Sequence, residues 1–382
     1  MNVFPHVRVE GSAIDRGRQY GAQAAGRVRR SVAAYREVFA YYAGWDWATV
    51  RREADRFEKP IAAFRPAYLD EIRGIAEGAG LDPGDVLAIN VRTEVMFAAK
   101  ARQAAGQLRA PDGCTAFAVV PPPGTDGSTL IGQNWDWLPH TSGTVVVLEA
   151  RQDEGPDFVT VVEAGLLAKT GMNSSGLGLV TNALVTDTDT GAPGIPYHLA
   201  LRAILDCETV SDALAALQSG ERSSAANYLI AHRDGSVVNV EAAPGDFGRL
   251  YLLFPEDGVV LHSNHFLSPG FGGKDVSVWV MPDSPLRLQR IRAGLRRRNG
   301  LPTLETFQAL LADHANYPSG LCCHPDPRKD PYDQGATVAS VLMDLGTQQM
   351  LLAGGNPCSA PYRQLDYREF LAKPSGAAEP AR

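Results

Sequence analysis

The chain has 382 residues, of which 45% are hydrophobic and 21% charged, so it can bury a substantial core and is not a disordered protein. Its net charge of −7 argues against a general affinity for nucleic acid, which requires a clustered positive surface. No run approaches the roughly 18 apolar residues of a membrane span, and residues 1–12 lack the apolar stretch of a signal peptide. We therefore expect a cytoplasmic protein with no nucleic acid or membrane partner.

The N-terminal part has helical periodicity from residue 11 to residue 97. The individual stretches are residues 31–42, 45–57, 68–79 and 86–97. Gly17 and Gly21 lie four residues apart and place small side chains on one helix face, which predicts close packing against another helix. We predict a helical segment over residues 1–113 that ends in an exposed linker.

At Cys114 the hydrophobic period changes from 3.6 to 2, and short β-rich runs alternate with turn residues. Strands are predicted within 114–184, helices within 196–218, strands within 227–263, helices at 284–298 and 304–314, and strands at 336–343 and 349–353. Each sheet needs its second face covered, so this order predicts an α+β fold with four layers, αββα, and two antiparallel sheets. We assign residues 114–372 to this catalytic region and residues 373–382 to a disordered tail.

The position of Cys114 is the most informative feature of the sequence. The thiol opens the first strand directly after Gly113, and the five cysteines do not form the pattern of a disulfide framework. Folding the first hairpin over its turn places Cys114 opposite Asn134 or Trp135, with Asp136 one step beyond. A thiol, an amide and a carboxylate are therefore expected to meet at one strand end.

This arrangement suits an N-terminal nucleophile. Cleavage of the bond between Gly113 and Cys114 would free an α-amine with an ordinary pKa of about 7.7–8.0, which can act as the base for the thiol of the same residue. Gly113 has no Cβ, so its carbonyl can be approached closely. The alternative is that Cys114 is a buried strand residue and Asp136 a turn residue, since cysteine is among the most buried residue types.

The run from Asp112 to Trp137, DGCTAFAVVPPPGTDGSTLIGQNWDW, strongly resembles the nucleophile segment of the acyl-coenzyme A:6-aminopenicillanic acid acyltransferase family. The resemblance implies a self-cleaving N-terminal-nucleophile hydrolase with an αββα fold. By position, it implies that Cys114 is the nucleophile, that Asp136 is the carboxylate near the amine-bearing substrate, and that Asn264 supplies the oxyanion hole. The residues alone leave the role of Asn264 open, because an asparagine in a turn can instead form hydrogen bonds with backbone groups.

Four further residues are candidates for substrate binding: Asn134, Trp135, Trp137 and Asn173. Phe266 and Phe271 are further aromatic candidates for an apolar acyl pocket, although aromatic residues at such positions usually belong to the core. This chain departs from the resemblance at one position. The resemblance implies a basic residue just before the strand at 336–343 that helps to hold a substrate carboxylate, and this chain has Gln334 there. Penicillin-type substrates are therefore doubtful unless another basic residue, such as Arg92 or Arg328, replaces it.

A zinc site is the main alternative to nucleophilic chemistry. The run Cys322-Cys323-His324, together with His262 and His265, contains suitable ligand types. However, adjacent cysteines are poorly arranged to chelate one ion, and no second ligand pair stands at the usual spacing. We therefore expect no metal and no other cofactor.

The predicted function is hydrolysis of N-acyl amines through a thioester at Cys114, by two self-cleavage fragments that stay associated. Acyl transfer to an amine and a non-cleaving αββα binding protein remain alternatives. No coenzyme A signature is visible in the sequence, which favours water as the acceptor.

Overall fold

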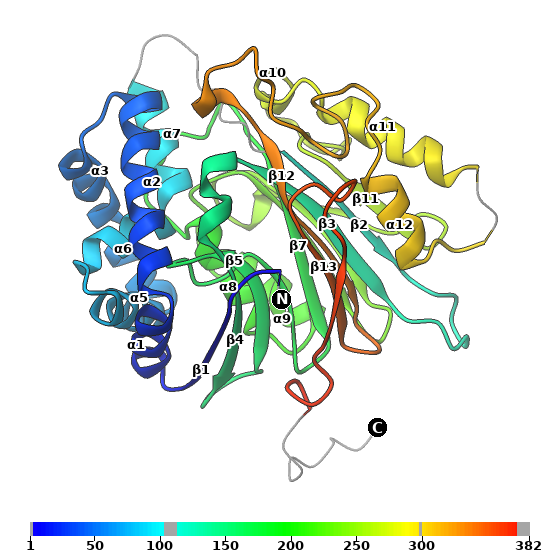
Figure 1. Ribbon diagram of the computed structural model, residues 1–382, viewed down its shortest axis with the longest axis horizontal. Coiled ribbons are helices and arrows are strands. Elements are labelled where there is room, and N and C mark those ends of the chain that lie inside the picture. Colours follow the sequence, from blue (N-terminus) through cyan, green and yellow to red (C-terminus); the bar gives the residue numbers. More distant parts are fainter. Residues whose placement is uncertain (1–2, 103–112, 298–299, 373–382) are drawn as a thin grey trace.

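The computed structural model describes residues 3–102, 113–297 and 300–372. Within these ranges two sheets pack face to face between helices, and a separate group of helices flanks one side of the molecule (Figure 1). This confirms the predicted α+β, αββα class. The predicted tail at 373–382 and the linker residues 103–112 lie outside the described residues.

In the described part of the chain, one sheet has eight strands. In spatial order they are β1 (His6–Gly11), β4 (Val145–Gln152), β5 (Phe158–Glu163), β6 (Thr170–Asn173), β7 (Leu177–Ala183), β8 (Ala226–His232), β9 (Val237–Ala242) and β10 (Leu250–Leu253). Neighbouring strands are antiparallel except for the first pair, because β1 runs parallel to β4. The strand β1 falls within the segment expected to be helical, and its short alternation of buried Val7 and Val9 was not recognised as a strand signal.

The second sheet has six strands among the described residues. In spatial order they are β11 (Val259–His262), β2 (Gly113–Val119), β3 (Leu130–Trp137), β12 (Ala336–Asp344), β13 (Gln349–Gly354) and β14 (Arg363–Asp366). Both β2 and β3 are interior strands of this sheet and are almost wholly buried. The predicted nucleophile region is therefore held rigidly on both edges.

Helices cover the outer face of each sheet. The eight-stranded sheet is covered by α8 (Tyr197–Leu205) and α9 (Val210–Gln218), and the six-stranded sheet by α11 (Ser284–Leu295) and α12 (Leu304–Leu311). A short helix, α10 (Ser277–Val280), precedes α11. The flanking group contains α1 (Ala13–Gln23), α2 (Ala25–Ala43), α3 (Trp47–Ala54), α4 (Glu58–Phe64), α5 (Pro66–Ala79), α6 (Pro83–Asn90) and α7 (Arg92–Arg102). The last two, α6 and α7, replace the single helix expected at 86–97, since the helix is interrupted at Val91.

Glycines allow α1 and α5 to pack backbone against backbone. A Cβ on Gly17 would overlap the carbonyl oxygen of Glu71, and one on Gly21 would overlap that of Ile75. Gly74 and Gly78 of α5 are equally close to the backbone of α1. The packing role predicted for Gly17 and Gly21 is therefore confirmed.

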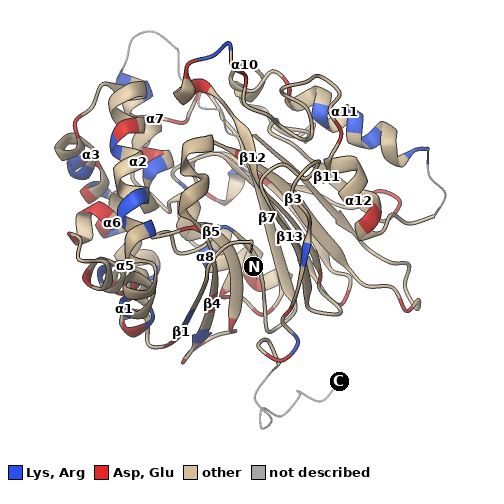
Figure 2. Cartoon of the chain, in the orientation of Figure 1, with Lys and Arg blue, Asp and Glu red and all other residues tan. Residues whose placement is uncertain are grey.

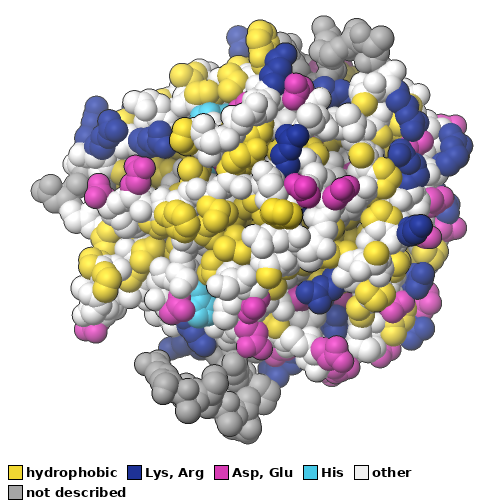
Figure 3. All heavy atoms as spheres, turned by 180° about the vertical axis from the view of Figure 1, so that it is seen from behind, with side chains coloured by type: hydrophobic (Ala, Val, Ile, Leu, Met, Phe, Trp, Pro, Cys, Tyr) yellow, Lys and Arg dark blue, Asp and Glu magenta, His cyan; other side chains and the backbone are white. Residues whose placement is uncertain are grey.

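Charged side chains lie mainly on the helices and loops, whereas the sheets between them carry few (Figure 2). The opposite face of the molecule has a band of hydrophobic side chains with charged groups around it (Figure 3). Among the described residues, no helix is both long and apolar enough to cross a membrane.

Candidate active site at Cys114

The hairpin of β2 and β3 sets the register of the site. Cys114 pairs with Trp135, and Gly113 pairs with Asp136. This confirms one of the two registers expected from the sequence. The bond between Gly113 and Cys114 therefore lies beside the Asp136 carboxylate, at the strand end of an interior hairpin.

The amide nitrogen of Cys114 is held by Asn264, which follows β11 on the other side of β2. Cys114 N–H donates to Asn264 Oδ1 over 2.8 Å, and Asn264 Nδ2 donates to the carbonyl oxygen of Ala183 over 3.0 Å. Asn264 is fully buried and Cys114 is 1% exposed. The side chain of Asn264 thus connects the predicted nucleophile to the end of β7 in the other sheet.

Asp136 is buried and fixed by the neighbouring strand β12. Thr337 Oγ1 donates a 2.6 Å hydrogen bond to Asp136 Oδ1. The other carboxylate oxygen, Oδ2, lies 3.0 Å from the place that a Cβ on Gly113 would occupy. Glycine at position 113 therefore lets the carboxylate approach the peptide that precedes Cys114.

Arg287 joins these groups and was not identified from the sequence. Its guanidinium donates to the Cys114 carbonyl over 2.7 Å and to Asn264 Oδ1 over 2.8 Å. Burial lowers its pKa, but the carboxylates of Asp283 and Asp136 raise that pKa above the ordinary value overall. The sequence shows that Arg287 lies four residues after Asp283 and four before Ile291, but only the structure shows that this face of α11 is buried.

Gln133 contacts the thiol of Cys114, and His265 directly follows Asn264 in the chain. Gln133 Nε2 lies 3.9 Å from Cys114 Sγ, and its Oε1 accepts a hydrogen bond from Thr181 N–H. His265 bonds to Ser284 over 2.7 Å, and burial lowers its pKa to about 4. His265 is therefore neutral near pH 7.

An acidic pocket opens beside Gly113 and Asp136. Four carboxylates and one lysine are among its lining residues, which include Asp136, Asp283, Asp326, Asp333 and Lys329. Two of these carboxylates, Asp283 and Asp326, form ion pairs with Arg287 and Arg328, so the lining is acidic but partly neutralised.

An apolar pocket adjoins the acidic one. Trp137 and Ala183 line it together with side chains from α2 and α7, and Val280 and Met281 line both pockets. Trp137 Nε1 donates to Tyr35 Oη over 3.1 Å, which fixes the indole in the pocket wall. Since Ala183 also accepts the hydrogen bond from Asn264, Cys114 is linked to both pockets.

The remaining substrate-binding candidates make other contacts. Asn134 Nδ2 donates to the carbonyls of Leu311 and Leu321, and Asn173 Nδ2 donates to those of Leu205 and Cys207. The ring of Trp135 is buried, with Lys169 Nζ 4.6 Å from its centroid. Phe266 and Phe271 stack on each other, 3.8 Å apart.

The two basic residues that were candidates for binding a substrate carboxylate, Arg92 and Arg328, are already paired with carboxylates of the protein. Arg92 lies in the apolar pocket wall and bonds Glu163 over 2.6 Å, while Arg328 bonds Asp326 over 2.8 Å at the surface. Gln334 Nε2 donates to the carbonyl of Lys329.

Comparisons with known proteins find similar sequences and solved structures. A curated relative, the 40 kDa form of acyl-coenzyme A:6-aminopenicillanic-acid-acyltransferase from Emericella nidulans, is 26% identical over 353 residues, covering 92% of this chain and 93% of the relative. Among solved structures, a mutant of conjugated bile acid hydrolase from Clostridium perfringens is 13% identical, covers 67% of this chain and 93% of that one, and has a TM-score of 0.45. Penicillin V acylase from Agrobacterium tumefaciens is 16% identical, covers 69% and 90%, and has a TM-score of 0.40.

The model of the acyl-coenzyme A:6-aminopenicillanic acid acyltransferase family matches residues 124–357, more than half of the chain. This range includes Asp136 and Asn264 and begins ten residues after Cys114. The chain therefore belongs to the acyl-coenzyme A:6-aminopenicillanic acid acyltransferase family of enzymes.

Proposed function

We propose that this enzyme cleaves itself between Gly113 and Cys114 and then hydrolyses N-acyl amines through a thioester at Cys114. The observation that carries the proposal is the position of Cys114 N, which bonds Asn264 Oδ1 at 2.8 Å while Asp136 lies beside Gly113. This nitrogen is the leaving group of self-cleavage and becomes the α-amine of the mature enzyme.

The reaction uses the same groups twice. In self-cleavage, Sγ attacks the Gly113 carbonyl carbon, the C–N bond breaks, and the nitrogen leaves as an amine after gaining a proton; water then hydrolyses the thioester. In turnover, the α-amine takes the thiol proton, Sγ attacks the substrate carbonyl, and the amine product leaves with that proton. Water then hydrolyses the acyl thioester, which releases the acid and restores the thiol. One N–H of Asn264 Nδ2 bonds Ala183, and we assign the second to the developing oxyanion.

The two pockets support an assignment of the two halves of the substrate. An apolar acyl chain suits the pocket of Trp137 and Ala183, because burial of apolar surface drives binding there. A neutral or cationic amine suits the acidic pocket, because a free carboxylate on the leaving group would face Asp136 and Asp283.

Acyl transfer to an amine is the second candidate function, because the relative and the family are both named as acyltransferases. It shares the thioester and differs only in the acceptor. Adding a primary amine to a hydrolysing sample separates the two: transfer predicts an N-acyl product that grows at the expense of the free acid, and hydrolysis predicts an unchanged acid yield.

Intact mass under denaturing conditions tests the central proposal. Wild-type protein should give two fragments, the second beginning at Cys114, and Cys114→Ala should give one unbroken chain. Cys114→Ser should cleave more slowly, because a hydroxyl is a weaker nucleophile than a thiol. Cys207→Ala, which removes another buried thiol, should cleave like wild type. An unbroken wild-type chain would favour the non-cleaving binding protein.

A paired substrate panel tests the assignment of the pockets. Each acyl chain is presented once on an amine and once on the corresponding amino acid, and kcat/KM is compared. We expect the amine to be the better leaving group in every pair. A consistent preference for the amino acid would contradict the assignment and leave self-cleavage untouched.

A further inference from the structure

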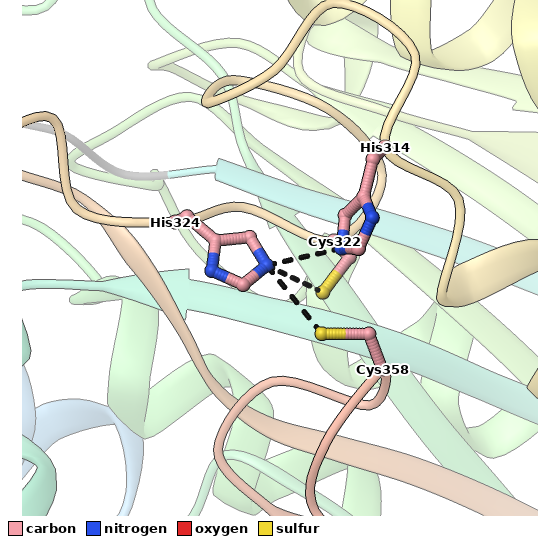
Figure 4. Close-up of side chains that lie close together, drawn as sticks. All are labelled: His314, Cys322, His324 and Cys358. Carbon is pink, nitrogen blue, oxygen red and sulfur yellow. Dashed lines mark hydrogen bonds between the residues drawn. The ribbon is translucent and has the colours of Figure 1, made fainter.

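A cluster of two histidines and two cysteines lies outside the site at Cys114. His314, Cys322 and His324 lie in the loop that follows α12, and Cys358 follows β13. One ligand atom from each lies within 4.8 Å of all the others, and the four side chains point toward one another (Figure 4). Two segments separated in sequence thus present two nitrogens and two sulfurs to one point.

The spacing matches a tetrahedral metal site. With Zn–S of about 2.3 Å and Zn–N of about 2.05 Å, tetrahedral geometry separates two nitrogens by about 3.3 Å and a sulfur from a nitrogen by about 3.6 Å. Here His324 Nε2 lies 3.1 Å from His314 Nε2, 3.4 Å from Cys322 Sγ and 3.5 Å from Cys358 Sγ.

Hydrogen bonding alone does not account for this crowding. A ring nitrogen has either one hydrogen or one lone pair, so His324 Nε2 can serve only one of its three neighbours. A cation at the centre would serve all four ligand atoms at once. Asn356 Nδ2, 3.5 Å from Cys322 Sγ, donates toward that sulfur, as polar groups commonly do around metal-bound thiolates.

We propose that His314, Cys322, His324 and Cys358 bind one Zn²⁺ ion as a closed structural site. Two thiolates and two imidazoles are a common ligand set for structural zinc, and four protein ligands leave no open position for water chemistry. The thiols release their protons to solvent on binding.

This proposal departs from the expectation from the sequence that the protein binds no metal. The candidate ligands in the sequence included Cys323, His262 and His265, none of which belongs to the cluster. They did not include His314 and Cys358, which belong to it. The missing ligands come from segments that only the folded chain brings together.

The site would brace one wall of the acidic pocket. Cys323, between two of the ligands, receives a hydrogen bond on its carbonyl from Thr337 N–H and donates its own N–H to Thr337 Oγ1. Thr337 Oγ1 in turn donates to Asp136. Zinc would therefore fix Asp136 through Thr337 and act as a positioning element.

Metal analysis of the full-length, tag-free protein tests the proposal. After incubation with Zn²⁺ and gel filtration, we expect about one zinc per chain, and Co²⁺ in its place should give the visible absorption of a tetrahedral cobalt thiolate. Cys358→Ser and His314→Asn should each weaken Zn²⁺ affinity by at least about tenfold in competition with a chromophoric chelator. Cys358 is exposed, which makes its substitution compatible with folding.

Matched substitutions elsewhere serve as controls. Cys207→Ser, His140→Asn and Cys114→Ala should retain about one zinc, the last because the nucleophile is not a ligand. Failure of wild-type protein to bind Zn²⁺, or equal affinity of Cys358→Ser and Cys207→Ser, would overturn the proposal. A Cys322–Cys358 disulfide in the freshly purified protein, detected as a mass lower by two hydrogens, would also overturn it. None of these readouts depends on self-cleavage.

Discussion

At the scale of single residues, Asn264 has the most connected position in the site. Its Oδ1 accepts from both Cys114 N–H and Arg287, and its Nδ2 donates to Ala183. One side chain thus carries an acceptor that orients the nitrogen of the proposed nucleophile and a donor group suited to an oxyanion. Two substitutions separate these roles.

Asn264→Ala should lower kcat by about 10²–10³, the usual effect of losing one oxyanion donor. Asn264→Asp keeps an acceptor for Cys114 N–H but removes the donor. It should therefore cleave itself faster than Asn264→Ala and still show the loss in kcat. Single-turnover kinetics on processed samples provide the measurement. An unchanged kcat in Asn264→Ala would leave this residue a structural role only.

Glu94 gives a stability prediction that depends on pH. It is fully buried, and burial raises its pKa from 4.5 to about 7, against hydrogen bonds from Tyr197 N–H and Ser224 Oγ. Between pH 4.5 and 7 the folded state keeps a proton that the unfolded state has lost, so this residue's contribution to the free energy of unfolding falls as pH rises.

Glu94→Gln removes this titration. The free energy of unfolding of Glu94→Gln, relative to wild type, should therefore increase by roughly 3 kcal/mol at most from pH 4.5 to pH 8. Urea unfolding at several pH values measures it. Parallel profiles for the two proteins would show that Glu94 does not titrate in this range.

The sequence was sufficient for part of this site. Cys114, Asp136 and Asn264 carry the motif, and antiparallel register alone places the first two together. Arg287 belongs to no motif, and its place in the helix predicted at 284–298 does not show that it faces the site. Only the buried face of α11 reveals its role, and that depends on which side of the helix the six-stranded sheet covers.

At the scale of elements, the contact between α1 and α5 brings two helix backbones together with no side chain between them. Gly21→Ala should lower the free energy of unfolding by about 1–3 kcal/mol or more, because backbone must move to admit the methyl group. Gly26→Ala is the matched control. It lies exposed near the start of α2 with nothing within 4 Å of an added Cβ, so it should be neutral or stabilise by about 0.4–1 kcal/mol.

Thermal or urea unfolding of both variants provides the measurement. Equal stabilities would mean that the two helices can separate at little cost.

Strong local patterns predicted most elements well. The residues of β5, β9 and α9 are those expected, because alternation, turn glycines and the Thr209 cap define them locally. β14 was missed, and β1 was too. Each is a short edge strand, and β1 also pairs with a strand that is distant in sequence, β4, so the local pattern of each is weak.

At the scale of the whole molecule, the two parts on either side of the proposed cleavage site share one core. A single cluster of buried apolar residues extends from Phe4 to Leu371, and β1 of the first part pairs with β4 of the second. The cleaved enzyme should therefore elute as one species under native conditions and separate into two fragments only in denaturant. Elution of the two fragments as separate native species would contradict this expectation.

The ladder between β1 and β4 also has a kinetic consequence. In the uncut precursor, residues 3–102 find the eight-stranded sheet at a rate independent of protein concentration. Once the chain is cut, the same pairing becomes a meeting of two molecules, limited by typical association constants of about 10⁵–10⁷ M⁻¹s⁻¹. Recovery of the mature enzyme from urea should slow on dilution, whereas Cys114→Ala should recover equally fast at every concentration. Maturation would thus make unfolding hard to reverse in dilute solution.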